Sequence, residues 1–345
     1  MTNVGGMQRV AMELCEQFEL HDEIELTRLV LHTPWKGVYY RAVPFLLSLL
    51  KRLPERAKGQ DVILFSSITT ALPLMCIGRR LARQGVRLVS IAHGLDVTMP
   101  NSAYQFAVRR TLPWLDVVLP VSRATERECK IRGARASRVV PNGVDLARMD
   151  GEQGPLPERL PEGARLLVSV GRQVKRKGFA WFIRNVMPRL DPSIHYWLAG
   201  DGPERDAIEQ AIRAAQLGSR VKVLGLVDDA VLRALFKRAE LLVMPNIVVQ
   251  GDMEGFGIVM IEAAAAGVPA LAADLEGIHD VVLHEQTGWL EPSGDADAFV
   301  SRVNSLEPRA IERAGQAASN RVRSELSWQA VTSRYIEALQ TRPVA

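Results

Sequence analysis

Short apolar runs rich in valine, isoleucine and leucine alternate along this chain with longer segments whose apolar residues recur at helical spacing. Strands that alternate with helices of this length are typical of βαβ units and predict a parallel sheet. In the first 150 residues we expect buried strands at Ile24–Leu31, Asp61–Phe65, Arg87–Ala92 and Asp116–Val121, and helices at Arg41–Arg56, Thr70–Gln84 and Asn101–Leu112.

The alternation stops near the middle of the chain and then starts again. The turn Pro141-Asn142-Gly143 and a stretch rich in proline, glycine and charge from Asp150 to Gly163 predict a linker. The fold class is therefore α/β, with two doubly wound domains at residues 1–150 and 151–325 and a C-terminal helix in 326–345 that we expect to pack back toward the first domain. In the second domain we expect strands at Leu166–Val170, Tyr196–Ala199, Val221–Leu224, Leu241–Met244 and Val268–Ala272, and helices at Trp181–Leu190, Glu204–Ala215, Asp229–Arg238 and Gly257–Ala266.

The composition is that of an ordinary globular protein. Of 345 residues, 47% are hydrophobic and 24% are charged, which excludes a disordered chain, a collagen-like repeat and a coiled-coil rod. The net charge of +4 is too small to indicate nucleic-acid binding. It is unevenly spread, because residues 1–150 carry +7 and residues 151–345 carry −3.

The cysteines and the apolar runs bear on the compartment. Cys15, Cys76 and Cys129 lie far apart, which argues against a disulfide framework and favours a reducing, cytoplasmic setting. No apolar run approaches the length of a membrane span. The segment Arg41–Arg56 is both aliphatic and basic, so it either lies on anionic lipid at the inner face of the cell membrane or simply covers the sheet.

Two carboxylates bracket the entrance of a predicted helix in the segment Glu254-Gly255-Phe256-Gly257-Ile258-Val259-Met260-Ile261-Glu262. Its glycines leave backbone N–H groups bare at a helix N-terminus, which suits a phosphate. Eight helical residues span about 12 Å, so one carboxylate can lie before the phosphate and the other beyond it. Because carboxylates accept hydrogen bonds from hydroxyls, a nucleotide-sugar fits this pattern. The alternative is that Glu254 caps the helix and Glu262 is a solvated helix residue.

A cluster of cations follows the first strand of the second domain. The segment Gly171-Arg172-Gln173-Val174-Lys175-Arg176-Lys177-Gly178 comes directly after Leu166–Val170. Cations at the carboxyl end of a strand can neutralise a diphosphate. The alternative is a solvated basic turn. The segment is no Walker A loop, because it lacks the G-K-[ST] sequence.

Taken together, these segments resemble the retaining GT-B glycosyltransferases of family 4, also called glycosyl transferases group 1. The family's E-x7-E pair corresponds to Glu254 and Glu262, and its R-x4-K pair to Arg172 and Lys177. The resemblance implies a GT-B fold, in which two Rossmann-like domains face each other across a cleft. Further matches are Val121-Ser122 through Gly133, Pro141-Asn142-Gly143-Val144-Asp145, Ala199-Gly200-Asp201-Gly202-Pro203 and Gly267-Val268-Pro269.

The resemblance also implies roles for the matching residues. Arg172 and Lys177 would bind the donor diphosphate, Glu254 would hold hydroxyls of the donor sugar, and Glu262 would hold those of the ribose. His93, in an H-G-x-D turn after the strand Arg87–Ala92, would lie near the reaction centre; its alternative role is that of a packed loop histidine. Backbone groups would contact sugar and phosphate at Gly255, Phe256, Gly257, Ile258 and Val259, and the base at Leu226 and Val227.

One part of the chain departs from the family pattern. Gly5 and Gly6 match the glycine loop that lies by the diphosphate, but only four residues stand before them, where the family has a full strand. That strand is central in such sheets, and its loss would leave neighbouring strands unpaired. We therefore expect a truncated start and an N-terminal domain without its first strand.

Two short motifs have simpler explanations. Asp295-Ala296-Asp297 matches the D-x-D of metal-dependent glycosyltransferases, but it opens a predicted helix after Ser293-Gly294, so helix capping explains it better. Gly200-Asp201-Gly202 begins like a dinucleotide fingerprint but lacks the third glycine.

The expected function is that of a retaining hexosyltransferase, with His93, Arg172, Lys177 and Glu254 as catalytic residues. It needs no metal or other cofactor, because fixed cations and amides stabilise the developing charge. A UDP-sugar is the favoured co-substrate and a GDP-sugar the alternative. The acceptor would be a glycan, a glycolipid or a small molecule in cell-surface polysaccharide, lipopolysaccharide or glycolipid synthesis, received by the basic first domain, with an anionic membrane surface as a further partner. The alternatives are a GT-B sugar-nucleotide epimerase and an inactive sugar-nucleotide-binding protein.

Overall fold

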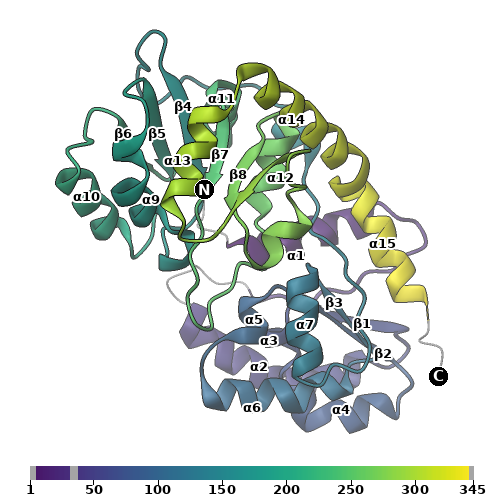
Figure 1. The fold of residues 1–345 in the computed structure, drawn as a ribbon. Helices are drawn as coiled ribbons and strands as arrows, with labels where there is room; N and C mark the ends of the chain where they lie inside the picture. Colours follow the sequence, from purple (N-terminus) through teal and green to yellow (C-terminus); the bar gives the residue numbers. More distant parts are fainter. Residues whose placement is uncertain (1–4, 32–37, 342–345) are drawn as a thin grey trace. The chain divides into compact units, whose positions relative to one another are not determined.

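The structure is a computed structural model that describes residues 5–31 and 38–341. The chain divides into two compact units. Unit 1 comprises Met1–Gly143, Gln250–Phe256 and Trp328–Ala345, and unit 2 comprises Val144–Val249 and Gly257–Ser327. Both units are α/β structures built on parallel sheets (Figure 1).

Unit 1 has, in its described residues, a three-stranded parallel sheet in the order β1-β2-β3. The strands are β1 (Val62–Phe65), β2 (Arg87–Ala92) and β3 (Val117–Pro120), close to the predicted positions. β2 is the central strand, and every residue of it after Arg87 is buried. The helices of this unit are α1 (Gly6–Glu19), α2 (Val38–Arg56), α3 (Ile68–Ala71), α4 (Leu74–Ala82), α5 (Leu95–Thr98), α6 (Ser102–Thr111), α7 (Arg123–Ile131) and α15 (Trp328–Gln340).

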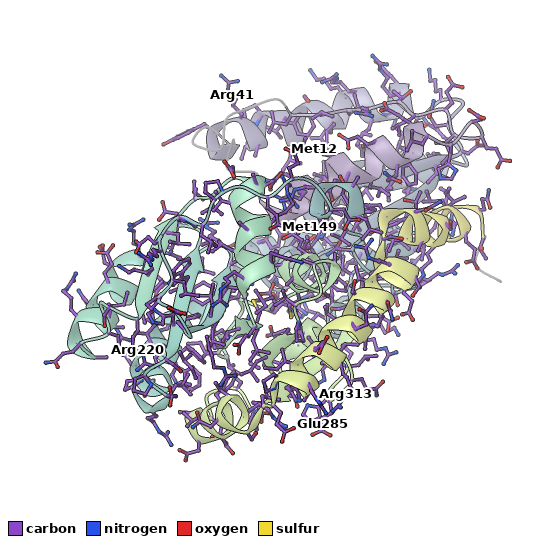
Figure 2. All side chains as sticks on the ribbon, turned by 90° about the horizontal axis from the view of Figure 1, so that it is seen from above. Met12, Arg41, Met149, Arg220, Glu285 and Arg313 are labelled. Atoms are coloured by element: carbon purple, nitrogen blue, oxygen red, sulfur yellow. The ribbon has the colours of Figure 1, made fainter. Side chains whose placement is uncertain are left out.

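The helix α2 has one buried and one exposed face. Leu49 and Leu53 lie in the core of unit 1, so the helix does cover the hydrophobic core. On its other side Val43 and Leu47 are each 59% exposed, and Arg41 extends outward from the ribbon (Figure 2). Among the described residues, no helix is long and apolar enough to cross a membrane.

Two predictions for unit 1 are wrong. The segment Ile24–Leu31 forms no strand. Leu29 packs against the core, but Val30 is 54% exposed, and in the described sheet the edge strand β1 pairs only with β2, so the segment does not extend the sheet. The predicted helix Thr70–Gln84 is divided into α3 and α4 at Pro73, which has no N–H for the helical ladder and a ring that disfavours a continuous helix.

The helix α15 contacts α1 although more than 300 residues separate them in the chain. The indole Nε1 of Trp328 donates a hydrogen bond to Glu13 at 2.6 Å. Gly143 packs on the same indole so closely that a Cβ there would lie 2.6 Å from a ring carbon. Arg138 pairs with Glu337 at 2.6 Å. The C-terminal helix predicted within residues 326–345 is confirmed, with the bounds Trp328–Gln340.

Unit 2 contains a six-stranded parallel sheet in the order β6-β5-β4-β7-β8-β9. In the centre of the sheet, Val168 of β4 lies opposite Trp197 of β5 on one side and Leu242 of β7 on the other. The five strands predicted for this region are confirmed to within two residues at their ends, and β9 was not predicted. The strands are β4 (Arg165–Val170), β5 (Ile194–Ala199), β6 (Val221–Gly225), β7 (Leu241–Met244), β8 (Ala270–Ala273) and β9 (Gly288–Glu291).

The helices of unit 2 cover this sheet, and aromatic rings fill much of the space beneath them. Phe182 lies against Tyr196 and Phe299, with ring centroids 5.0 and 6.0 Å apart. The helices are α8 (Leu146–Met149), α9 (Phe179–Asn185), α10 (Arg205–Ala214), α11 (Asp229–Arg238), α12 (Ile258–Ala265), α13 (Ala296–Ser305) and α14 (Pro308–Arg321).

The capping explanation for the Asp295-Ala296-Asp297 motif is confirmed. Asp295 is the N-cap of α13, and its side chain accepts a hydrogen bond from the Ala298 N–H at 3.0 Å. Asp297 pairs with Arg189 at 2.5 Å.

Candidate functional site

The strand order of unit 2 locates a candidate ligand site. From β4 the chain continues to β5 and β6 on one side of the sheet, whereas β7, β8 and β9 lie on the other side. The order therefore reverses between β4 and β7. In open α/β sheets ligands bind outside the carboxyl ends of the strands at such a switch point. The loops that leave β4 and β7 are thus the first place to look for functional side chains in this unit.

The loop after β4 is the R-x4-K segment, and it packs tightly against the loop after β7. Gly178 has φ +67°, and a Cβ at this position would lie 1.9 Å from the carbonyl oxygen of Pro245. The N–H of Ile247 donates to the carbonyl of Arg176 at 2.9 Å. Lys177 is only 6% exposed, whereas Arg172 is exposed. A solvated basic turn therefore does not describe Lys177.

The Ala199-Gly200-Asp201-Gly202-Pro203 turn, at the carboxyl end of β5, also packs against the R-x4-K segment. A Cβ on Gly200 would lie 2.0 Å from the carbonyl oxygen of Gly171, and one on Gly202 would lie 2.3 Å from that of Gln173. The side-chain amide of Gln173, which is fully buried, donates to the Gly200 carbonyl at 2.8 Å. The glycines of this turn thus permit backbone contact with the R-x4-K segment, and Gln173 is a supporting residue that the sequence motifs did not single out.

The helix α12 begins at the carboxylate segment. Its N-cap is Gly257, with φ +83°, so Glu254 is not the N-cap residue of this helix. Glu262 is 5% exposed, which contradicts the alternative of a solvated helix residue. The predicted phosphate-binding positions Ile258 and Val259 form the first turn of α12, where backbone N–H groups have no intrahelical acceptor.

Glu262 has a partner that no sequence motif indicates. Nη1 of Arg148 donates to Oε1 of Glu262 at 2.7 Å. The same guanidinium binds Asp229 with two hydrogen bonds, from Nε at 2.9 Å and from Nη2 at 2.6 Å. Burial alone lowers the pKa of Arg148, but the hydrogen bonds to Asp229 and the charge of Glu262 outweigh it and raise the pKa above its ordinary value.

Leu226 and Val227, the predicted base-contacting residues, connect β6 to α11. Leu226 is 61% exposed, and Asp228 caps α11 by accepting from the Val231 N–H at 2.8 Å. The capped helix end fixes the position of this connection. Asp229, which binds Arg148, is the first residue of the same helix.

In unit 1, His93 lies in a turn organised by one buried carboxylate. Asp96, 2% exposed, accepts from the His93 N–H at 2.8 Å and from the Ile68 N–H at 2.9 Å. It therefore ties together the segments that follow β2 and β1. Nε2 of His93 lies 2.9 Å from the carbonyl oxygen of Ser66. Because a carbonyl only accepts, this nitrogen carries the proton, and in the neutral ring Nδ1 is an acceptor.

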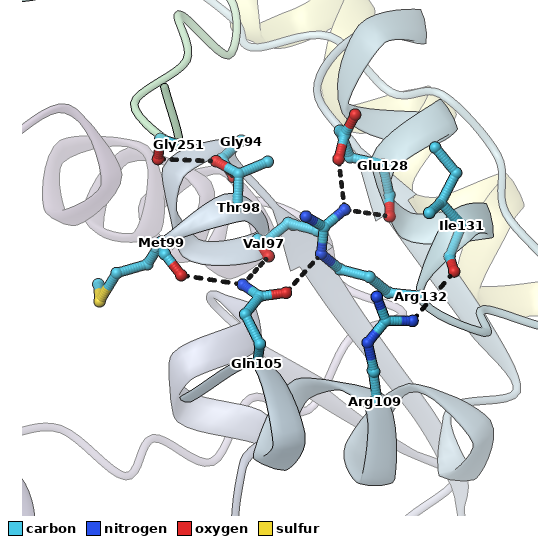
Figure 3. Close-up of polar contacts among 10 residues, drawn as sticks. All are labelled: Gly94, Val97, Thr98, Met99, Gln105, Arg109, Glu128, Ile131, Arg132 and Gly251. Atoms are coloured by element: carbon cyan, nitrogen blue, oxygen red, sulfur yellow. Dashed lines mark hydrogen bonds and ion pairs between the residues drawn. The ribbon is translucent and has the colours of Figure 1, made fainter. Parts of the chain in front are cut away.

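The loop Gln250–Phe256, which carries Glu254, also belongs to unit 1. A Cβ on Gly255 would lie 1.7 Å from the carbonyl oxygen of His93. Thr98 donates to the carbonyl of Gly251 at 3.4 Å, beside a network of α6 and α7 residues (Figure 3). Glu254 is 7% exposed. The structure thus brings the histidine turn and this loop into direct contact.

In the described residues, no cluster of three or more His, Cys, Asp or Glu side chains is arranged to hold a metal ion.

The predicted site residues fall into two groups, one in each unit. Gly5 is the N-cap of α1 and Gly6 is its first residue. Unit 1 contains Gly5, Gly6, His93, Glu254, Gly255 and Phe256, and unit 2 contains Arg172, Lys177, Leu226, Val227, Gly257, Ile258, Val259 and Glu262.

Two Rossmann-like units with these loops define a GT-B glycosyltransferase. Comparison with protein families identifies the family: the chain belongs to glycosyltransferase family 4. The model described as Glycosyltransferase Family 4 matches residues 4–148, and the model described as Glycosyl transferases group 1 matches residues 155–321. The predicted family and fold class are confirmed.

Individual relatives and structures agree with this assignment. Glycogen synthase of Mycobacterium tuberculosis is 32% identical over 56% of this chain, and the match spans about half (46%) of that protein. N-acetyl-α-D-glucosaminyl L-malate synthase of Bacillus anthracis is 25% identical, with 96% of this chain and 93% of that protein covered. The structure of Anabaena HepE in complex with UDP is similar, with a TM-score of 0.80, 18% identity, and coverage of 98% of this chain and 97% of that one.

Proposed function

We propose that this protein is a retaining hexosyltransferase that moves a sugar from a nucleotide-diphosphate donor, with UDP favoured, to an acceptor hydroxyl. The observation that carries the proposal is the buried Lys177 at the switch point of unit 2, held between the loops that follow β5 and β7. Cations at the carboxyl end of a strand can neutralise the charge of a diphosphate. HepE, which has a similar fold, was solved with UDP and with UDP-glucose.

In this proposal each group acts on a defined part of the donor. Arg172 and Lys177 stabilise the charge that develops on the leaving diphosphate, a task that fixed cations perform without a metal. Glu262 accepts hydrogen bonds from the ribose and Glu254 from the donor sugar. The sugar–phosphate bond breaks, the acceptor oxygen bonds to the same sugar carbon on the same face, and the hydroxyl proton passes to the leaving phosphate oxygen.

The acceptor and its surroundings are assigned by charge. We propose that unit 2 binds the donor and that the basic unit 1 receives a glycan, glycolipid or small-molecule acceptor in cell-surface polysaccharide, lipopolysaccharide or glycolipid synthesis. The exposed side of α2 combines Val43 and Leu47 with the cations Arg41, Lys51 and Arg52. Such a face suits peripheral binding to an anionic membrane surface on the cytoplasmic side.

The proposal is tested with Lys177→Ala and Glu254→Ala. Release of nucleotide from UDP-, GDP- and ADP-sugars is measured, and both variants are expected to lose about 10²–10³-fold in turnover, as when one charge-stabilising group is removed from other active sites. Lys175→Ala is the matched control, because Lys175 is in the same segment but exposed. Unchanged turnover in both variants would refute the assignment.

A further inference from the structure

Arg148 forms an ion-pair cluster with two carboxylates of unit 2. Its guanidinium binds Asp229 at 2.6 and 2.9 Å and Glu262 at 2.7 Å. The side chains are poorly accessible, at 17% for Arg148 and 6% for Glu262. Arginine suits this position because its rigid, planar fork of donors can serve two carboxylates at once.

The cluster joins three elements that the proposed function uses or adjoins. Arg148 is on α8, which follows the Pro141-Asn142-Gly143-Val144-Asp145 turn. Asp229 begins α11, directly after the connection that contains Leu226 and Val227, and Glu262 is on α12. The backbone of α8 is fixed as well, because Nη1 of Arg233 on α11 donates to the carbonyl of Arg148 at 2.8 Å.

A hydrogen bond to one carboxylate oxygen determines where the other oxygen points. Oε1 of Glu262 accepts from Arg148, and the two oxygens of a carboxylate can each accept more than one hydrogen bond. Arg148 therefore sets the orientation of Glu262. Asp229 holds Arg148 in place from the helix that follows the base-contacting connection.

We propose that Arg148 is a positioning residue for recognition of the ribose: anchored by Asp229, it orients Glu262 so that the nucleotide's ribose hydroxyls are bound, and it couples this contact to the connection that meets the base. The proposal rests on the proposed nucleotide-sugar site. It assigns a role to Arg148, which follows the Asn142-Gly143 turn, and no motif in the sequence indicated this role.

The experiment compares dissociation constants for UDP and 2′,3′-dideoxy-UDP, which lacks both ribose hydroxyls. The wild-type protein is expected to bind the dideoxy compound at least about tenfold more weakly, since a hydrogen bond to a charged group contributes about 1.5–3 kcal/mol. Glu262→Gln reports how much of this ratio depends on the carboxylate. In Arg148→Met the ratio is expected to fall to that of Glu262→Gln, whereas a merely structural role would weaken both ligands equally and leave the ratio unchanged.

Two further variants make the result unambiguous. Arg165→Met removes another arginine–carboxylate pair of unit 2, with Glu240 at 2.8 Å at the start of β4, and is expected to keep the wild-type ratio. Asp229→Asn removes the carboxylate that anchors Arg148 but keeps the arginine, and it is expected to lower the ratio of the two dissociation constants. This variant tests the proposal if Arg148→Met does not fold. A wild-type ratio in the folded Arg148 and Asp229 variants overturns this inference alone. Failure of the wild-type protein to bind UDP, GDP or ADP overturns the proposed function and this inference together.

Discussion

Replacing Gly178 with alanine is expected to destabilise unit 2 and to displace the loop that carries Lys177. Gly178 has φ +67°, a conformation that costs an L-residue about 1–2 kcal/mol. The new methyl carbon would also lie 1.9 Å from the carbonyl oxygen of Pro245, whereas real contacts of this kind are essentially never shorter than 3.0 Å. The loop after β7 or the R-x4-K segment must therefore move by at least 1.1 Å, the difference between these two distances.

The cost of this movement can be separated from the cost of the backbone angle. Gly163 has φ +73° in the same unit, but a Cβ there meets nothing within 4 Å. Gly163→Ala should therefore lose only the conformational part, about 1–2 kcal/mol. Gly178→Ala should lose a further 1–3 kcal/mol, roughly the cost of overpacking a well-packed site. For a domain of about 150–250 residues the difference corresponds to roughly 2–12 °C in Tm.

Thermal unfolding followed by circular dichroism measures this difference, and donor turnover is measured beside it. Gly178→Ala is expected to unfold at a lower temperature than Gly163→Ala and to lose turnover, because Lys177 directly precedes the strained position. Equal Tm values for the two variants would show that the contact with Pro245 does not constrain this loop.

Three further predictions concern other parts of the molecule. Burial, followed by the charges of neighbouring cations, lowers the pKa of His195, so below about pH 6.5 the unfolded chain binds more protons than the folded protein and stability is lost as the pH falls. His195→Gln should therefore show a smaller drop in Tm between pH 7.5 and 5 than the wild-type protein, and an equal drop would count against this reasoning. In Gly255→Ala the new Cβ would lie 1.7 Å from the carbonyl oxygen of His93, so turnover should fall at least about tenfold, because small displacements in an active site reduce the rate strongly. Gly218→Ala, where the new methyl group meets open space, should keep its turnover, and equal activities of the two variants would contradict this. Leu47→Asp should reduce flotation of the protein with anionic vesicles, and a wild-type protein that shows no preference for anionic over neutral vesicles would contradict membrane binding.

Much of the fold could be predicted because the buried strands are continuous apolar runs. β2 and α11 have the predicted bounds, since flanking charges and a capping aspartate mark their ends in the sequence. The segment Ile24–Leu31 also contains aliphatic residues, but Glu25 and Arg28 interrupt them, and it forms no strand. Whether such a segment pairs with the edge of a sheet is a tertiary property that the local pattern does not contain.

The site was predicted less completely than the fold. Lys177 and Glu262 could be chosen as candidates because each belongs to a motif with a fixed spacing, and both are buried. Arg148 could not, because its two carboxylate partners lie 81 and 114 residues away in the chain, and an arginine in a polar turn is ordinarily solvated. The sequence contained one signal for such a partner, which is the position of Glu262 within the apolar run of α12. A glutamate buried there requires a cation, although the sequence does not say which one.

The contact between α1 and α15 has a consequence for the order of events during synthesis. Trp328 donates a hydrogen bond to Glu13 and packs on Gly143, so unit 1 lacks one of its own helices until the residues that follow unit 2 have been synthesised. Unit 2, which ends at Ser327, is complete before that moment. We therefore expect the second unit to fold first, while part of the surface of the first unit stays uncovered and accessible to chaperones until α15 has been synthesised.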